Sequence, residues 1–244
     1  MSSVETCMAV NAPSACGGVL YYPTRSGRPA GLTISRDFPY SMILAILNQK
    51  GGVGKTVSTI NLAAALAASG ETVGVLDADS QQQAIAFAVP GVQILSTPNT
   101  AALQKAVDLS MADWTLIDCP PSLMEAAPAL PLAHIVLAPV PPRFQDLSGF
   151  ARLRQTVDAA RERGNSHLRL KVLVTMRDAR VTLQAEYEAQ LRAAFGDDVL
   201  TTVIPRAAVF EKAASAHQSA LQYAPSSAGA AAYRALAQEI RALR

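Results

Sequence analysis

The sequence is poor in cysteine, in charged residues and in long apolar runs, and each absence excludes a class of protein. Its three cysteines, Cys7, Cys16 and Cys119, are too few and too scattered for a disulfide framework or a metal-binding set. No stretch reaches the roughly 18 uninterrupted apolar residues of a membrane span. The first residues lack the basic and then apolar pattern of a secretory leader. We therefore expect a protein of the reducing cytoplasm without integral membrane contact.

Charge is scarce and unevenly distributed along the chain. Only 16% of the 244 residues are charged while half are hydrophobic, which indicates a well-filled core. Residues 42–142 contain 3 Lys/Arg and 7 Asp/Glu, whereas residues 143–244 contain 15 and 10. This basic excess permits an electrostatic contact with DNA in the second half, although solvated helix faces would account for it equally well.

The first 41 residues differ from the rest in composition. They combine several prolines and glycines with no helical or strand periodicity, which predicts a disordered or loosely attached tail over 1–41. Met42 begins the first buried-strand pattern, "MILAILN", so both Met1 and Met42 are candidate starts of translation. We expect a single folded domain over 42–244.

Short apolar runs alternate with helical stretches from residue 42 onward. The runs are continuous and rich in Val, Ile and Leu, as in parallel strands covered on both faces. The predicted fold is therefore α/β, a doubly wound and mainly parallel sheet of about seven strands with helices on both faces. The predicted strands are 43–48, 72–77, 92–96, 114–118, 135–140, 170–175 and 200–204. The predicted helices are 55–69, 81–87, 99–109, 122–132, 145–163, 181–195, 207–217 and about 226–243.

The first chemical motif, "QKGGVGKT", lies between the first strand and the first helix. Glycines allow backbone N–H groups to point at phosphate oxygens, and the helix N-terminus adds a positive dipole. Lys55 would reach the β- and γ-phosphates and Thr56 would ligate Mg²⁺. Gln49 stands where the strict phosphate-loop pattern has glycine, so the loop is a deviant one. The predicted nucleotide-binding residues are Lys50, Gly51, Gly52, Val53, Gly54, Lys55, Thr56 and Val57.

Carboxylates follow two later strands. Asp77 and Asp79 come after "VGVL", and Asp118 ends "WTLID". The carboxyl ends of parallel strands open onto one edge of a sheet, which is where such folds bind ligands. A lone Asp after a strand is often a helix cap, an alternative that applies to Asp77 above all.

The chain resembles the ParA family of partition ATPases, within the larger class that shares "KGGVGKT" with MinD. The resemblance covers nearly all of residues 42–244, where "VLDADSQQQA", "WTLIDCPPSL", "VLVTMRDAR", "TVIPR" and "AAAYRALAQEI" follow in family order. It implies a Mg²⁺-dependent ATPase that hydrolyses ATP slowly alone and faster with a ParB-like or adaptor partner. It also implies non-specific DNA binding, association with the nucleoid, and a plasmid, a chromosome or another assembly as cargo.

Several residue roles are implied by this resemblance. Lys50 matches the signature lysine that reaches across an ATP-sandwich homodimer to the phosphates of the partner subunit. Asp79 matches the residue that positions or activates the attacking water, so Lys50 and Asp79 are the catalytic candidates. Asp118 matches the residue that holds Mg²⁺ through a water, and Pro205 lies where the family cradles adenine.

The DNA contacts implied by the resemblance are fewer than usual. Arg180 and Arg206 match family positions, but Val209 and the segment "PSSAG" replace commonly basic ones. Each phosphate contact that is lost weakens binding and reduces its salt dependence. The chain contains no N-terminal helix-turn-helix pattern, so we do not expect site-specific operator binding.

Two other functional classes stay open at this point. A MinD-like membrane-associated ATPase would use the amphipathic end "AGAAAYRALAQEIRALR" as a surface helix. An electron-transfer ATPase like the nitrogenase iron protein would need cluster cysteines, and residues 42–244 contain only Cys119. We expect Cys119 to be a buried structural thiol.

Overall fold

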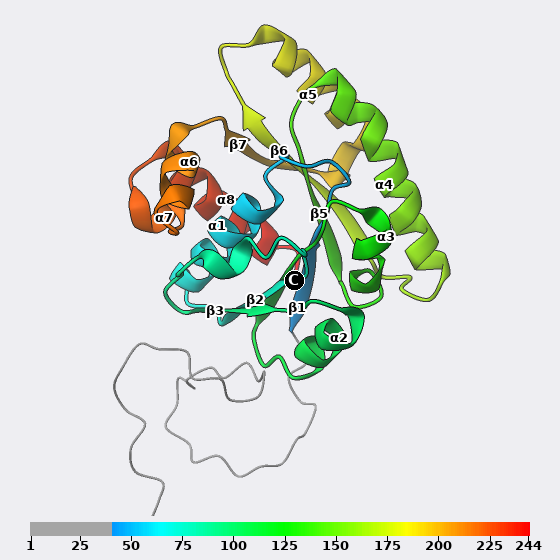
Figure 1. Cartoon of the computed structure of the whole chain (residues 1–244). Coiled ribbons are helices and arrows are strands. Elements are labelled where there is room, and N and C mark those ends of the chain that lie inside the picture. The colour runs from blue at the N-terminus through cyan, green and yellow to red at the C-terminus, as the bar shows by residue number, and fades with distance from the viewer. Residues whose placement is uncertain (1–40) are drawn as a thin grey trace, which may run out of the picture.

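A seven-stranded sheet forms the centre of the molecule (Figure 1). The computed structural model describes residues 41–244, apart from the side chains of 144–150. All strand pairs are parallel, and their order across the sheet is β3-β2-β4-β1-β5-β6-β7. Each of the seven predicted strands is confirmed. The strands are β1 (Met42–Ile46), β2 (Val73–Asp77), β3 (Val92–Ser96), β4 (Trp114–Asp118), β5 (Ile135–Val140), β6 (Arg169–Arg177) and β7 (Val199–Pro205).

Helices cover both faces of this sheet. Figure 1 shows α1, α6, α7 and α8 on one side and α2, α3, α4 and α5 on the other. The α-helices are α1 (Lys55–Ala68), α2 (Thr100–Asp108), α3 (Leu123–Ala126), α4 (Phe144–Glu162), α5 (Thr182–Phe195), α6 (Ala208–Ser215), α7 (Ala220–Tyr223) and α8 (Ala228–Arg241). Short 3₁₀ turns are η1 (Ala84–Ala86), η2 (Ala127–Ala129) and η3 (Gly196–Asp198).

The two faces of the sheet produce two separate cores. Leu44 and Ile46 of β1 pack with α1 and α8, whereas Ala45 and Leu47 pack with α2 to α5. This division follows from the strand period of two, because successive side chains point to opposite faces. Both faces are therefore apolar, which explains the continuous hydrophobic runs of the sequence.

The central position of β1 determines where a ligand can bind. β1 pairs with β4 on one side and β5 on the other, and strand order reverses around it. In open α/β sheets the crevice for ligands lies at the carboxyl ends of the strands beside such a reversal. The loop that follows β1 therefore emerges in this crevice.

Several predicted helices differ from the observed ones. The helix predicted over 81–87 is wrong, since only η1 forms there. The N–H groups of Ala84 and Ile85 donate to the Asp77 carboxylate at 2.8 and 3.2 Å, and Gln82 has a positive φ of 47°. A chain held this way turns sharply before it enters β3.

The helix predicted over 122–132 is also interrupted. It consists of α3 and η2, with Pro128 in the first residues of η2. Beyond the predicted helix 207–217, which appears as α6, the chain forms the additional short helix α7. Ser219 starts α7 with a capping box that it shares with Gln222.

The predicted tail at 1–41 lies outside the described residues except for its last one. Among the described helices, none combines the length and the apolar character needed to cross a membrane.

Candidate nucleotide-binding site

The loop between β1 and α1 has the backbone of a phosphate cradle. Gly52 and Gly54 have φ values of 70° and 92°, which L-residues with side chains adopt only with strain. Gly54 is the N-cap of α1, and the first turn of that helix contains no acidic residue. The N-terminal N–H groups and the positive end of the helix dipole are thus left for an anion.

Three hydrogen bonds hold this loop in place. Asn48 donates from Nδ2 to the carbonyl of Pro139 at 2.7 Å and accepts from the N–H of Lys50 at 3.0 Å. The Thr175 hydroxyl donates to the carbonyl of Val53 at 3.0 Å. The loop is therefore fastened to β5 on one side and to β6 on the other, which preorganises it for a ligand.

A hydroxyl and a carboxylate meet below the loop. The Thr56 hydroxyl donates to Oδ2 of Asp118 at 2.7 Å, and the Thr59 hydroxyl donates to Oδ1 at 3.1 Å. Asp118 is 1% exposed. Burial raises the pKa of Asp118 to about 7, and the negative charge of Asp77 adds to this effect, while the two hydroxyls oppose it.

Lys55 belongs to the same buried cluster as Thr56 and Asp118. Its side chain is among the buried polar groups, with 8% of the residue exposed. Burial lowers the pKa of Lys55, while the charges of Asp118 and Asp79 counteract that change. Lys55, Asp79 and Asp118 therefore interact electrostatically from three different elements of the chain.

Asp77 and Asp79 have different surroundings. Asp77 is buried and accepts from the N–H groups of Ala84, Ile85 and Asp79, so it caps the turn that follows β2. Burial raises the pKa of Asp77, although these N–H bonds lower it in part. Asp79 is half-buried and accepts from the N–H of Gln81 at 3.0 Å. The capping interpretation thus holds for Asp77, while Asp79 points to the ligand crevice.

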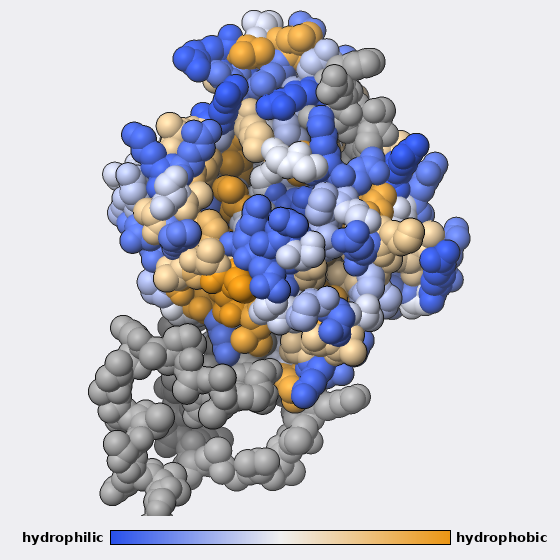
Figure 2. Space-filling model, in the orientation of Figure 1, coloured by the Kyte–Doolittle hydropathy of each residue, from blue (hydrophilic) through white to orange (hydrophobic). Residues whose placement is uncertain are grey.

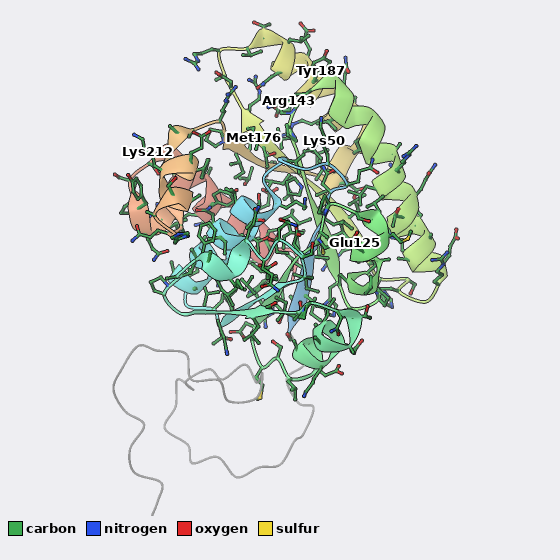
Figure 3. The ribbon with its side chains drawn as sticks, in the orientation of Figure 1. Lys50, Glu125, Arg143, Met176, Tyr187 and Lys212 are labelled. Atoms are coloured by element: carbon green, nitrogen blue, oxygen red, sulfur yellow. The ribbon has the colours of Figure 1, made fainter. Side chains whose placement is uncertain are left out.

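A cavity of about 460 Å³ opens above these groups. Its walls come from the phosphate loop, the segment after β2 and the segment after β4. Figure 3 shows Glu125, from α3, on the side of the crevice opposite α6. The lining includes Gly51, Gly52, Gly54, Lys55, Thr56, Val57, Asp79, Ser80, Gln81, Pro121, Ser122, Glu125 and Met176.

A second pocket of about 290 Å³ continues from the first, and both share Gly54, Val57 and Met176. Apolar side chains dominate it, and in Figure 2 hydrophobic colour lies at the bottom of a hollow in the upper left of the molecule. The predicted adenine contact, Pro205, is part of its wall. The other lining residues include Ser58, Arg143, Thr175, Ile204, Arg206, Ala207, Phe210, Glu211 and Tyr233.

The remaining predicted residues occupy other places. Lys50 is half-buried on the loop (Figure 3), and it is Gly51 and Gly52 after it that line the cavity. Val53 is buried and contributes its carbonyl to the Thr175 bond. Cys119 is fully buried, as predicted for a structural thiol, and burial raises its pKa far above the usual range.

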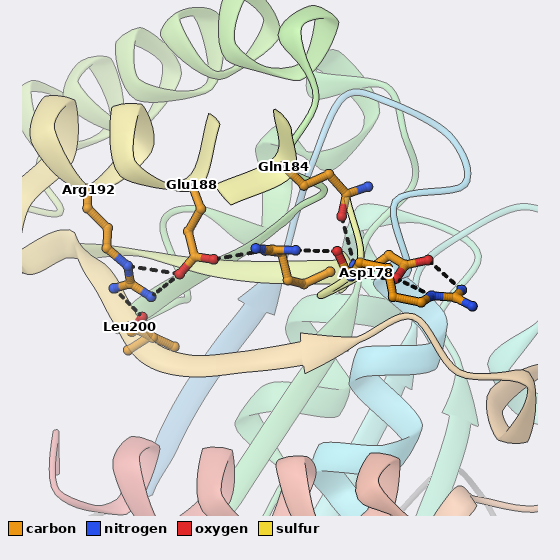
Figure 4. Close-up of polar contacts among 7 residues, drawn as sticks. Asp178, Gln184, Glu188, Arg192 and Leu200 are labelled. Atoms are coloured by element: carbon orange, nitrogen blue, oxygen red, sulfur yellow. Dashed lines mark hydrogen bonds and ion pairs between the residues drawn. The ribbon is translucent and has the colours of Figure 1, made fainter. Parts of the chain in front are cut away.

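Arg180 and Arg206 lie beyond the end of β6 and β7. Arg180 is 89% exposed at its side chain and forms a two-pronged ion pair with Asp178, at 3.0 Å from Nε and 2.8 Å from Nη2 (Figure 4). Arg177 bridges Asp178 and Glu188 in the same network. The N–H of Arg206 donates to the carbonyl of Arg177 at 2.9 Å, and its side chain borders the apolar pocket.

The residue types at the loop fit a magnesium ion. Hydroxyl and carboxylate oxygens are the hard ligands that Mg²⁺ prefers, and it retains several waters and phosphate oxygens. Asp118 is a buried carboxylate that receives two hydroxyl donors from the described part of the chain, so its charge is incompletely balanced. Thr56 and Asp118 could therefore hold the ion together with a bound polyphosphate.

Sequence reasoning missed several residues of the site. Asn48, Met176 and Phe210 were not predicted as site residues, although Met176 lies inside the family segment "VLVTMRDAR". Thr59, one turn after Lys55, carries a hydroxyl on the same face of α1 and could have been found from that spacing.

The strand, glycine loop and helix, with a buried lysine and a hydroxyl–carboxylate pair, define a phosphate-loop nucleotide-binding domain. The comparisons with known proteins identify its family. The chain belongs to the CobQ/CobB/MinD/ParA nucleotide-binding domain family, whose model matches residues 44–220.

Curated relatives cover nearly the whole domain. The chain is 38% identical over 236 residues to the chromosome-partitioning ATPase Soj of Thermus thermophilus, covering 82% of this chain and 95% of that protein. It is 32% identical to the chromosome partitioning protein ParA of Caulobacter vibrioides, with 81% and 93% covered. The resemblance to the ParA family is thereby confirmed, and with it a nucleotide-binding ATPase domain of the ParA and MinD class.

Solved structures have the same fold at lower identity. MinD of Pyrococcus horikoshii, solved with Mg-ADP, has a TM-score of 0.65 and 22% identity over 83% of this chain and 97% of its own. Cobyrinic acid a,c-diamide synthase of Mycobacterium smegmatis, solved with an ATP analogue and magnesium, has a TM-score of 0.67 and 24% identity over 82% of this chain and 94% of its own. These likenesses establish the fold.

Proposed function

We propose that this protein is a Mg²⁺-dependent partition ATPase that binds ATP at the β1–α1 loop and positions DNA or another cargo. The observation that carries the proposal is the convergence of buried Lys55 with the Thr56–Asp118 pair at the N-terminus of α1. A buried cation beside an uncapped helix N-terminus is suited to a polyphosphate. The relatives named Soj and ParA support partition as the biological role.

The chain's own residues have distinct tasks in this proposal. Lys55 would bind the β- and γ-phosphates, and Thr56 and Asp118 would hold Mg²⁺, Asp118 through a water as the family resemblance implies. Mg²⁺ would offset the charge that develops on the phosphate oxygens. Asp79, half-buried at the cavity wall, positions the water that attacks the terminal phosphate. Pro205 and the apolar pocket accept the base.

Replacement of Lys55 tests the nucleotide site directly. Lys55→Ala removes a charge-assisted contact in a buried site, so affinity for a fluorescent ATP analogue should fall about 100-fold or more. Lys105→Ala, which removes an exposed lysine on α2, is the matched control and should bind normally. Equal affinity of Lys55→Ala and wild type would remove the basis of the proposal.

Lys50 acts in trans in the proposed ATP-sandwich homodimer. It lies half-buried on the phosphate loop and matches the signature lysine of the family, which supports a role towards a neighbour. Lys50→Ala should bind ATP yet stay monomeric and lose turnover, whereas Asp79→Ala should accumulate an ATP-bound dimer that does not hydrolyse. Sedimentation with ATP distinguishes the two. A Lys50→Ala protein that dimerises and turns over normally would exclude a role in trans.

Non-specific DNA binding by the ATP dimer is the next part of the proposal. Arg180 and Arg206 are exposed, and the second half of the chain carries the basic excess. Asp178 neutralises part of the Arg180 charge, so DNA phosphates must compete with this ion pair. Each phosphate contact contributes about 0.9 to the salt slope, so the few basic contacts predict weak binding with a shallower salt slope than a fully basic relative would give.

A shift assay with random duplex DNA at low salt tests this part. Arg180→Ala should weaken binding to all sequences alike without affecting dimerisation. Binding should depend on ATP because dimerisation doubles the number of phosphate contacts. If the protein does not bind DNA with ATP, with ADP or without nucleotide, the result would argue against a nucleoid-associated cytoplasmic role. It would also argue against DNA as the surface on which cargo is positioned.

The packing of α8 favours this role over a MinD-like membrane role. Tyr233, Leu236 and Ile240 are buried against α1 and β7, so the apolar side of the terminal helix already has a partner. A membrane-surface helix needs that side free. A ParB-like protein or another adaptor is the partner proposed to stimulate hydrolysis, and failure of vesicles to co-sediment with the ATP form would support this choice.

A further inference from the structure

β6 is irregular where it passes the phosphate loop. Its pairing with β7 shifts register between Val174 and Arg177. Met176 lies within this bulge with a φ of 54°, in the left-handed region. A methionine there has no side-chain hydrogen bond to compensate for the steric cost, and residues held this way often have a functional reason.

The bulge is fixed from both sides. On one side the hydroxyl of Thr175 donates to the carbonyl of Val53 in the phosphate loop. On the other side the carbonyl of Arg177 accepts from the N–H of Arg206 and so resumes contact with the β7 segment. The surrounding structure therefore imposes the conformation of Met176, which directs its side chain into the crevice.

The Met176 side chain lies at the junction of the two cavities. It lines both the phosphate cavity of about 460 Å³ and the apolar pocket of about 290 Å³. Its Cε is 3.7 Å from the point where a Cβ on Gly54 would be, so it covers the last glycine of the loop. Figure 3 shows Met176 between Lys50, on the phosphate loop, and Lys212, on α6.

We propose that Met176 is a positioning residue that holds the sugar and base of a bound nucleotide in register with its phosphates. The inference rests on the proposed nucleotide-binding function and deepens it. A thioether is flexible and polarisable, so it can pack against a sugar and the edge of a purine while still covering Gly54. Lys55, Thr56 and the loop N–H groups would bind the phosphates, whereas the Met176 side chain has no polar hydrogen to donate to them and would contact the sugar and base. Its loss should therefore weaken nucleotides but not an inorganic polyphosphate.

Three variants of Met176 separate the side chain from the backbone. Met176→Ala and Met176→Gly both lose the side chain, and affinity for ADP should fall about tenfold in each. Affinity for inorganic tripolyphosphate should stay within about twofold of wild type in both. Met176→Leu keeps a long apolar side chain and should restore ADP affinity to within about threefold of wild type. Isothermal titration of the full chain with ADP and with tripolyphosphate, each with Mg²⁺, measures these values.

Melting temperatures of the same proteins test the strained backbone. Glycine adopts a φ of 54° without the steric cost of a Cβ, so the melting temperature of Met176→Gly should be about 3 °C above that of Met176→Ala. His217 is the matched control because it also has a φ of 54° but lines neither cavity. His217→Gly should likewise melt above His217→Ala, and both should bind ADP as wild type does.

The outcomes are distinguishable. If Met176→Ala and Met176→Gly bind ADP like wild type, the positioning role is refuted while nucleotide binding stands. If both lose tripolyphosphate as strongly as ADP, Met176 acts on the loop and the inference is again refuted. If wild type binds neither ADP nor ATP, the proposed function itself fails and this inference fails with it.

Discussion

Replacement of Asp118 by asparagine should make the nucleotide-free protein more stable and at the same time abolish its Mg²⁺-dependent nucleotide binding. Asp118 is 1% exposed, and its partners are two neutral hydroxyls, from Thr56 and Thr59. Lys55 is nearby but does not offset the cost of burial, and Asp77 adds a second negative charge. An amide of the same shape removes the charge. Its oxygen still accepts from the Thr56 hydroxyl, and its N–H₂ can donate to the Thr59 hydroxyl, which in turn donates to the carbonyl of Lys55.

The size of the effect follows from the pKa of Asp118. Burial raises this pKa from 3.8 to about 7, and each unit corresponds to about 1.36 kcal/mol, so the ionised form costs the folded protein about 4 kcal/mol. A raised pKa means that the folded state keeps a proton that the unfolded state has lost. Stability from this group is therefore complete below about pH 4, declines as the pH rises, and is fully lost above about pH 7.

Urea unfolding in the presence of EDTA, followed by circular dichroism, measures this difference. The free energy of unfolding of Asp118→Asn should exceed that of wild type by almost nothing near pH 4 and by up to about 4 kcal/mol near pH 8. Asp108→Asn, on the exposed side of α2, is the control and should show no such trend. A difference that stays constant over this range would refute the assignment of a charged, poorly balanced Asp118.

The same experiment with Mg²⁺ and ATP gives the functional half of the prediction. A ligand at about 100 times its Kd stabilises the folded state by about 2.7 kcal/mol, so wild type should gain this amount. Asp118→Asn should gain little, because the amide cannot supply the carboxylate oxygen that the ion requires. A stabilised variant that still binds Mg-ATP at wild-type affinity would contradict the metal role.

Three further predictions concern the packing and the boundaries of the domain. Gly229→Ala should destabilise the protein by about 1–3 kcal/mol in thermal unfolding, because the added Cβ would lie 2.7 Å from the ring of Phe210. An unchanged Tm would mean that α6 and α8 separate freely. Glu239 accepts from the backbone and hydroxyl of Thr201, and although burial raises its pKa, these hydrogen bonds lower it below the usual value overall. Its stabilisation is therefore present above about pH 4.5 and lost as the pH falls, so Glu239→Gln should lower the Tm at neutral pH but not near pH 3. Removal of residues 1–41 should leave ATP turnover intact, since β1 begins at Met42; a truncated protein that fails to fold would place the tail inside the domain.

The sheet and the phosphate loop were predictable because their signals are local. A buried parallel strand is a short apolar run whatever its neighbours are, and all seven runs were found on that basis. The glycines and Lys55 belong to a contiguous motif that ends in a helix start. The failed helix at 81–87 has a non-local cause, because the Asp77 carboxylate takes the N–H groups that a helix would have used.

The apolar half of the site could not be predicted because it depends on contacts between distant segments. Met176 reaches Gly54 only because the pairing of β6 with β7 slips by a residue, and the sequence around Met176 carries no sign of that slip. Phe210 faces the pocket because Tyr233 of α8 packs against its ring, with the centroids 5.7 Å apart. The register of one strand and the docking of one helix decide both positions.

The two halves of the site differ in the way that their functions require. The phosphate half is built from charge, and its groups are costly in the empty protein, as the raised pKa of Asp118 and the lowered pKa of Lys55 indicate. A bound ion and polyphosphate together would balance these charges and so reduce the cost. The affinity for a nucleotide would then depend on its terminal phosphate rather than on its base. The apolar half has no such penalty and can contribute affinity equally for ATP and ADP. In the proposed cycle, discrimination between the two nucleotides, on which the proposed switch between dimer and monomer would depend, would therefore come from Lys50, Lys55 and Asp118 and not from the base pocket.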